Sequence, residues 1–159
     1  MARQPEPREP VTSWASSPAV RSVMRGNRSR DTSPEIRLRS ALHRRGLRYR
    51  IHHRPLPAAR RTVDIAFTRA RIAVEVRGCF WHACPEHGNQ PRVNADFWRT
   101  KLDRNRQRDA ALEEALSAAG WDVIVVWEHE DAEAAADRIA QRLRRESEAA
   151  TPTGDCGTT

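Results

Sequence analysis

Ten consecutive residues, 78–87, restrict the possible fold more than any other part of the chain. They combine two thiols, two imidazoles and two adjacent aromatic rings: Cys79, Cys84, His82, His87, Phe80 and Trp81. Cysteines five residues apart, with a histidine three residues later, have the close spacing of a tetrahedral zinc site. A fourth ligand has to come from elsewhere in the chain. A folded metal knuckle would push the two aromatic rings outward, where they are costly unless they bury against a partner.

The cysteines favour a metal site over a disulfide. Cys156 lies in a terminal segment of small and polar residues, which leaves Cys79 and Cys84 as the pair of interest. A disulfide between them would close a very short loop and stabilise little. No apolar signal segment precedes the domain, and no apolar run reaches the length of a membrane span. We therefore expect a cytoplasmic, nucleoid-associated protein with no membrane partner.

Positive charge is concentrated in the N-terminal part of the chain. The formal net charge is +7, and between Arg21 and Arg61 thirteen arginines are accompanied by only Asp31 and Glu35. Coding bias explains why Lys101 is the single lysine, but it does not explain this shortage of acids. A positive field raises the affinity for phosphate backbones in a salt-dependent way. The charge and the aromatic rings together predict a nucleic-acid partner.

The chain is predicted to form one domain over residues 20–147, because residues 1–19 and 148–159 have compositions that cannot build a core. A helix is expected to start at residues 31–35, where Thr32 and Glu35 match a capping box. Three early strands precede any alternation with helices, which predicts an α/β (α+β) fold with a mixed sheet flanked by helices. The predicted helices span about 32–45, 96–119 and 131–146, and the predicted strands span 47–51, 63–67, 72–76 and 123–127.

Two carboxylates are predicted to lie side by side on neighbouring strands. Side chains alternate between the faces of a strand, so the apolar residues of 63–67 leave Asp64 on the opposite face. The same alternation in 72–76 leaves Glu75 and Arg77 on that face. With the Val76 carbonyl, these carboxylates would form an oxygen site suited to Mg²⁺. The alternative is that Asp64 and Glu75 simply pair with arginines on an exposed sheet face.

His82 is the candidate general base of such a site. The motif Asp64…Glu75-x-Arg77 is similar to the Asp…Glu-x-Lys arrangement of the restriction-endonuclease-like fold, with arginine in the lysine position. Arginine does not deprotonate and cannot act as a base. An imidazole titrates near neutral pH and can.

Taken together, several short motifs resemble the very short patch repair (Vsr) DNA mismatch endonuclease family. The resemblance covers roughly residues 20–130, and its motifs occur in the family's order and spacing. It implies a restriction-endonuclease-like fold with a structural Zn²⁺ and a catalytic Mg²⁺. It also implies nicking of double-stranded DNA on the 5′ side of the T in a T:G mismatch that arises from 5-methylcytosine deamination. The motifs are residues 30–35, Val63-Asp64, residues 78–82, Asp96-Phe97-Trp98, Gly120-Trp121 and residues 126–128.

The resemblance also assigns individual residues. It implies that Asp64 binds the metal, that His82 is the base or positions the attacking water, and that Glu35 is a further active-site acid. It implies action as a monomer, and a functional link to a cytosine-5 DNA methyltransferase and a repair polymerase. Trp121 and Trp127 are expected to pack in the core. The residues that match rings and an arm inserted into the duplex beside the mismatch are Phe80, Trp81, Trp98 and Met24.

Two departures from the family pattern concern the metal sites. Glu75 supplies a carboxylate that many members lack, and Arg77 replaces a histidine. We expect Glu75 to contribute to the Mg²⁺ site, and Arg77 to hold a phosphate oxygen or to stabilise developing charge. His129 stands where some members have a cysteine ligand. The resemblance therefore implies a Cys₂His₂ zinc site formed by Cys79, Cys84, His87 and His129.

Two other functions fit the same residues. One is a restriction-type nuclease of this fold with another recognition site and double-strand cleavage. The other is a catalytically weak, zinc-containing DNA-binding module, because Arg77 departs from the usual active-site pattern.

Overall fold

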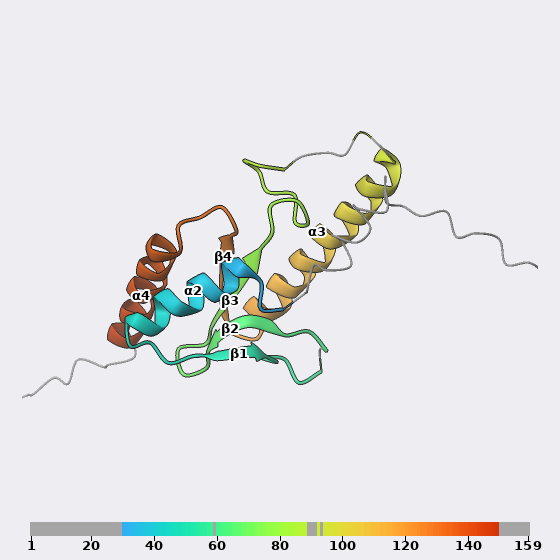
Figure 1. The fold of residues 1–159 in the computed structure, drawn as a ribbon. Coiled ribbons are helices and arrows are strands. Elements are labelled where there is room, and N and C mark those ends of the chain that lie inside the picture. Colours follow the sequence, from blue (N-terminus) through green and yellow to red (C-terminus); the bar gives the residue numbers. More distant parts are fainter. Residues whose placement is uncertain (1–29, 59, 89–91, 93, 150–159) are drawn as a thin grey trace, which may run out of the picture.

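A four-stranded mixed sheet lies between helices in the computed structural model, which describes residues 30–58, 60–88, 92 and 94–149 (Figure 1). This confirms the predicted fold class. Met24 and the rest of the N-terminal segment lie outside the described residues. The elements in chain order are α2 (Ser33–Arg44), β1 (Arg50–His53), β2 (Val63–Phe67), β3 (Ile72–Arg77), α3 (Ala95–Ala118), β4 (Asp122–Trp127) and α4 (Ala132–Ala149).

The strands follow one another across the sheet in the order β1-β2-β3-β4. Strands β1, β2 and β3 are antiparallel neighbours, joined by short connections. Strand β4 pairs with β3 in parallel, because α3 carries the chain back to the starting end of the sheet. The ends of β3 and β4 therefore lie at the same edge, with Arg77 opposite Trp127.

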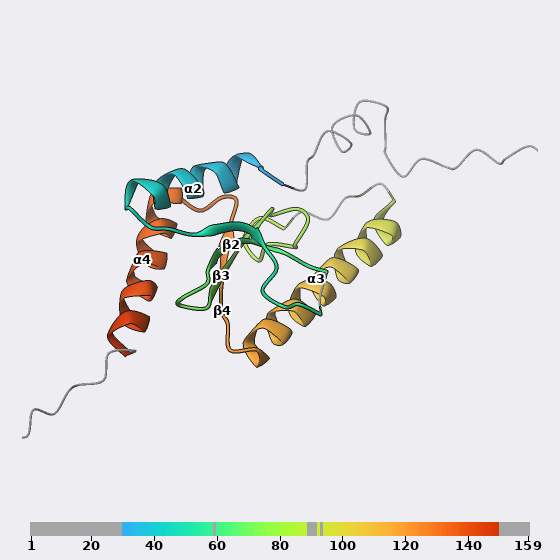
Figure 2. The ribbon, with the colours of Figure 1, turned by 90° about the horizontal axis from the view of Figure 1, so that it is seen from below.

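Helices cover both faces of the sheet. Figure 2 shows α2 and α4 on one side and α3 on the other. On the first side, Leu38 and Leu42 of α2 and Ile139 of α4 pack against Ile65 and Val74. On the second side, the buried cluster includes Ala66, Ala73, Leu112, Leu116 and Trp121. Through this cluster α3 contacts the small alanines of β2 and β3.

The start and end of α2 follow from its sequence. Thr32 is the N-cap residue and forms a capping box with Glu35, as predicted, and Pro34 occupies the first turn. After the helix ends, Gly46 has a φ of +70° and donates its N–H to the carbonyl of His43. Glycine adopts this left-handed conformation without steric cost. The chain can therefore turn sharply from α2 into β1.

Two predicted details are wrong. The first strand spans Arg50–His53 instead of residues 47–51. Antiparallel pairing places Arg50 opposite Ala66, and β2 ends one residue later at Phe67, so residues before Tyr49 have no strand opposite them. The second error lies in the predicted helix 96–119. Its apolar residues Leu102, Leu112, Ala115 and Leu116 predict an inward face, but Ala115 is exposed on α3. Trp121 is buried in the core, as predicted, whereas Trp127 is half-buried.

The helices of the described residues include none with the length and hydrophobicity needed to cross a bilayer.

Candidate active site and metal cluster

A cleft of about 840 Å³ opens at one end of the sheet, between the start of α2 and the middle of α3. Strands β2 and β3 form its floor, and the loop after β3 forms one wall. The cleft contains every residue that was predicted to act in catalysis. These are Glu35, Asp64, Glu75, Val76, Arg77 and His82.

Asp64 lies in the floor of this cleft. Its Oδ2 accepts the main-chain N–H of Val76 at 2.8 Å, one step beyond the last strand pair, Ile65 with Val74. Burial raises the pKa of Asp64 to about 6, against the lowering effect of the Val76 N–H, and the negative charges of Glu35 and Glu75 add to the rise. A carboxylate that resists ionisation because of burial and nearby acids is one that a bound cation would stabilise. The Asp64 carboxylate therefore suits a divalent metal.

Glu35 approaches the cleft from the first turn of α2. Its carboxylate accepts the hydroxyl of Thr32 at 2.8 Å and the N–H of Asp31 at 3.1 Å, and only 4% of the residue is exposed. The helix cap and the position beside the cleft are thus compatible roles. His52 on β1 brings a ring nitrogen to the same place, so ligand atoms of Asp31, Glu35 and His52 lie within 4.8 Å of one another. Asp31 also forms an ion pair with Arg39, whose Nη2 lies 2.6 Å from the Asp31 Oδ1.

Arg77 is held by two carboxylates at the end of β3. Its Nη2 lies 2.8 Å from Glu75 on the same strand and 2.5 Å from Glu113 on α3. The pairing of Glu75 with an arginine agrees with the alternative interpretation of the sequence for that residue. Asp64 has a different environment, because its carboxylate accepts the main-chain N–H of Val76. Burial lowers the pKa of Arg77, but the ion pairs of Arg77 with Glu75 and Glu113 outweigh this effect and keep the pKa above its usual value.

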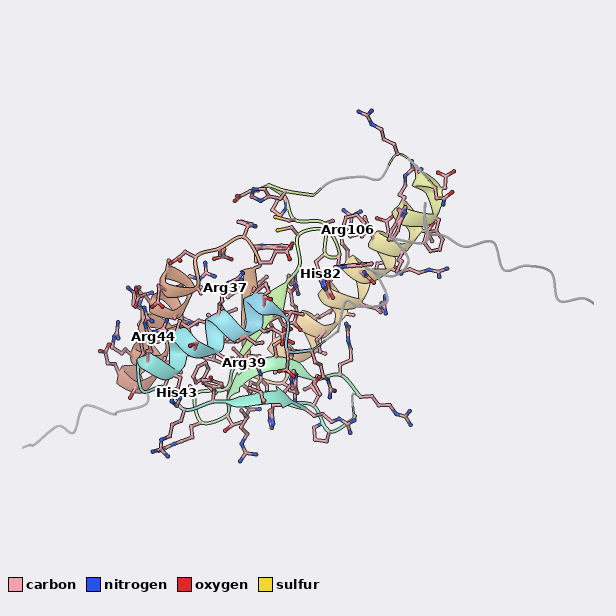
Figure 3. The ribbon with its side chains drawn as sticks, in the orientation of Figure 1. Arg37, Arg39, His43, Arg44, His82 and Arg106 are labelled. Carbon is pink, nitrogen blue, oxygen red and sulfur yellow. The ribbon has the colours of Figure 1, made fainter. Side chains whose placement is uncertain are left out.

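His82 pairs with a carboxylate that the sequence interpretation missed. Its Nδ1 lies 2.5 Å from Oδ2 of Asp109, a buried residue of α3, and Arg61 lies 3.7 Å from the other oxygen. A signal for Asp109 was present in the sequence. It occupies the inward-facing stripe of α3 together with Leu102, Leu112 and Leu116, where an acid needs a specific partner. In Figure 3, His82 lies between the end of the sheet and α3.

The structure brings together the four residues expected to bind zinc. The ligand atoms of Cys79, Cys84, His87 and His129 all lie within 4.8 Å of one another. The Sγ of Cys79 is 3.1 Å from Nδ1 of His129, and the rings of His87 and His129 are 4.3 Å apart. Because β3 and β4 are parallel neighbours, the loop after β3 meets His129, the second residue after the end of β4.

The environment of these thiols suits a cation. Burial, with the neighbouring Cys84, raises the pKa of Cys79 to about 11, so the thiol ionises at neutral pH only with a compensating positive charge. Two sulfurs and two imidazoles are a common tetrahedral set for Zn²⁺. Next to them, Glu128 accepts the main-chain N–H of Cys79 at 2.7 Å and holds the loop in place.

The aromatic rings expected to insert into DNA pack on one another. The ring centroid of Phe80 lies 5.1 Å from that of Trp81 and 5.2 Å from that of Trp98. The ammonium group of Lys101 lies over the Trp81 and Trp98 rings, at 5.3 and 5.6 Å. Trp98 is buried in this cluster, with 5% exposed, whereas Phe97 beside it is 43% exposed. Phe97 is a further aromatic residue at this surface. Its position next to Trp98 in the sequence was the signal that could have identified it.

Comparisons with known proteins identify the family of the chain. The family model described as DNA mismatch endonuclease Vsr matches residues 15–87. The type II nicking enzyme V.NaeI of Lentzea aerocolonigenes is 43% identical over 122 residues, which are 76% of this chain and 74% of that protein. The type II nicking enzyme V.XorIIP of Xanthomonas oryzae is 44% identical over 112 residues, 69% and 79% of the two chains. The DNA mismatch endonuclease Vsr of Escherichia coli K12 is 34% identical over 109 residues, 66% of each. The chain therefore belongs to the Vsr family of DNA mismatch endonucleases.

Proposed function

We propose that the protein is a divalent-metal-dependent endonuclease that nicks one strand of double-stranded DNA on the 5′ side of the T in a T:G mismatch. The observation that carries this proposal is the half-buried Asp64, with a pKa of about 6, in one cleft with the His82–Asp109 pair. Family membership supports the endonuclease activity, and several relatives are named as nicking enzymes. The T:G mismatch is proposed because the motifs of the sequence resemble those of the Vsr family.

The oxygen donors for the catalytic metal are assigned to Asp64 and Glu75, with the Val76 backbone beside them. A bound Mg²⁺ would polarise the scissile phosphate and lower the pKa of a coordinated water. Asp64 has to be ionised to serve as a ligand. Because its pKa is about 6, protons compete with the metal below that pH. Arg77 lines the same cleft and contributes positive charge beside the phosphate.

His82 is assigned as the general base, and Asp109 as the residue that positions it. Asp109 accepts the proton on Nδ1, which leaves the lone pair on Nε2 to receive a proton from water. The neighbouring Arg61 places a positive charge 3.7 Å from the other carboxylate oxygen of Asp109. Glu35 contributes a further negative charge at the α2 side of the cleft.

Asp109→Asn is expected to reduce the maximal nicking rate by on the order of 10²-fold or more, because the asparagine amide would donate to Nδ1 and move the imidazole proton to Nε2. Single-turnover nicking at several pH values measures this effect. The dependence of the rate on pH should also differ from that of the wild type, a change that a purely structural role would not cause.

Asp137→Asn is the matched control, since it makes the same substitution on the exposed face of α4, where Asp137 pairs with Arg45. It should leave the rate and the pH profile unchanged. Equal pH profiles for Asp109→Asn and the wild type would remove Asp109 from the proposed mechanism.

Two structural assignments complete the proposal. Zn²⁺ held by Cys79, Cys84, His87 and His129 would join the loop after β3 to the end of β4. The adjacent rings of Phe80, Trp81 and Trp98, with Met24 from the N-terminal segment, would enter the duplex beside the mismatch. Because these rings pack on one another, DNA binding has to separate them and exchange their contacts for contacts with bases.

Nicking of a duplex with a single T:G mismatch, compared with the same duplex carrying T:A, tests the function. Each strand carries a different label, so the assay reports which strand is cut and where. We expect one cut, on the 5′ side of the mismatched T, only with the T:G duplex and only with added divalent metal. Equal cutting of both strands in either duplex would indicate a restriction-type nuclease instead. Binding without cutting at any metal concentration would indicate a DNA-binding module.

A further inference from the structure

The Arg77 guanidinium is shared between two elements by a single nitrogen. Its Nη2 contacts Glu75 on β3 at 2.8 Å and Glu113 on α3 at 2.5 Å. The Arg77 side chain is 11% exposed and the Glu75 side chain 12%, whereas that of Glu113 is 40% exposed. Glu113 therefore reaches the arginine from the solvent side of the cleft, and Glu75 reaches it from the floor.

The same guanidinium is incompletely satisfied. Within the described part of the chain, the buried Nε of Arg77 has no hydrogen-bond partner. A buried donor without an acceptor is unfavourable, because its contact with water is lost and not replaced. Both ion pairs of Arg77 are made by its Nη2 atom instead. Glu75 and Glu113 therefore share one nitrogen of the cation, which has two N–H groups.

The sharing of Arg77 has a consequence for Glu75. A carboxylate that is fully paired with an arginine is a poor ligand for a divalent metal, because the metal has to displace the guanidinium. A carboxylate that shares its arginine with a second acid retains more negative charge. Glu113 has this effect on Glu75, and it also holds Arg77 beside the cleft when Glu75 turns toward a metal.

We propose that Glu113 is a positioning residue that withdraws the Arg77 guanidinium from Glu75, so that Glu75 is available to the catalytic divalent metal. This inference rests on the proposed metal-dependent nuclease function. It gives Glu113 and Arg77 opposite effects on metal binding at one site. Loss of Glu113 leaves Arg77 entirely to Glu75 and weakens metal binding, whereas loss of Arg77 frees Glu75 and strengthens it.

Mn²⁺ binding to the zinc-loaded, DNA-free protein at pH 8 tests the proposal, with free Mn²⁺ counted by electron paramagnetic resonance. Asp64 is ionised at this pH. Glu113→Gln should weaken Mn²⁺ binding by about fivefold, and Arg77→Gln should strengthen it by a similar factor. In the double variant, Glu113→Gln should have almost no further effect, because no guanidinium remains to be withdrawn. Nicking by Glu113→Gln should recover its rate as the metal concentration rises.

Glu114→Gln is the matched control, because Glu114 is the next residue of α3 and is exposed. The proposal is overturned if Glu113→Gln binds Mn²⁺ as the control does. It is also overturned if Glu113→Gln weakens binding equally with and without Arg77, which would indicate direct attraction between Glu113 and the metal. Arg77→Lys serves as a second variant if Arg77→Gln unfolds, and it should bind Mn²⁺ less tightly than Arg77→Gln. A wild-type protein that binds no Mn²⁺ would instead contradict the metal site of the proposed function.

Discussion

Asp64→Asn is expected to abolish nicking of the T:G duplex and, at the same time, to make the protein more stable at pH 8. The rate should fall by on the order of 10³-fold or more, because an uncharged amide is a poor ligand for a hard divalent cation. Asparagine retains an oxygen that can accept the Val76 N–H, so the end of the sheet should stay intact. Single-turnover nicking measures the first effect, and thermal unfolding measures the second.

The direction of the stability change follows from the raised pKa. The carboxyl group has a pKa of about 6 in the folded protein and 3.8 when unperturbed, so folding favours its protonated form. The stability linked to Asp64 is fully present below pH 3.8 and is lost as the pH rises through about 6. The loss amounts to about 3 kcal/mol at pH 8. Asparagine does not ionise, and the unfolding midpoint should therefore rise by roughly 10 °C at pH 8.

At pH 4 the wild type and Asp64→Asn should unfold at nearly the same temperature. Asp122→Asn provides the control, because Asp122 lies on β4 and pairs with Arg142 at 2.6 Å, away from the cleft. That variant should nick normally and gain no stability. An Asp64→Asn protein that nicks at the wild-type rate would remove Asp64 from the metal site.

His129→Ala should have the second large effect, through loss of zinc. The variant removes one of four ligands in a site that joins two distant segments of the chain. Zinc affinity should decrease by more than about 100-fold, since substitutions outside the ligand shell already cost 10- to 100-fold. The loop after β3 would then lose its attachment to β4, and nicking should fall with it. Metal analysis, competition with a chelator and thermal unfolding measure these changes.

His43→Ala is the matched control for the zinc site. His43 is an exposed histidine at the end of α2 and lies far from His82 in Figure 3. It should keep one zinc per chain and unfold at the wild-type temperature. If His129→Ala also retained one zinc per chain with unchanged affinity, His129 would not be the fourth ligand.

The predicted cleft depended on patterns that are local in sequence. Alternation within β2 and β3 was enough to place Asp64 and Glu75 on one face, and the antiparallel register makes them neighbours. The capping box located Glu35 at the start of α2. Each of these inferences uses residues within a few positions of one another. Local steric rules fix such relations before tertiary packing begins.

The partners on α3 could not be predicted in the same way. Asp109 and Glu113 are four residues apart, and helical periodicity places them on adjacent turns. Which strand residues they meet depends on how α3 is rotated and shifted along the sheet. Side-chain packing of Leu112 and Leu116 against Ala66 and Ala73 determines that position. No single segment of the sequence contains this information.

Sequence patterns also could not predict which of the aromatic residues are exposed. The knuckle was expected to present Phe80 and Trp81 outward, and Trp98 was expected to join them at the DNA. Trp98 is instead covered by its neighbours, while Phe97 is exposed. Two adjacent aromatic residues on a helix point in different directions, and the sequence does not indicate which of them packs inward.

One hydrogen bond joins the sheet to the chemistry of the cleft. Past the Ile65–Val74 pair, the Asp64 side chain accepts the Val76 N–H and so continues the contact between β2 and β3. The amide proton of Val76 is therefore a built-in label for the charge on Asp64. Its magnetic resonance frequency follows the carboxylate to which it donates. The ionisation of the metal-site aspartate can thus be observed in the resting protein, at one backbone position, without DNA or turnover.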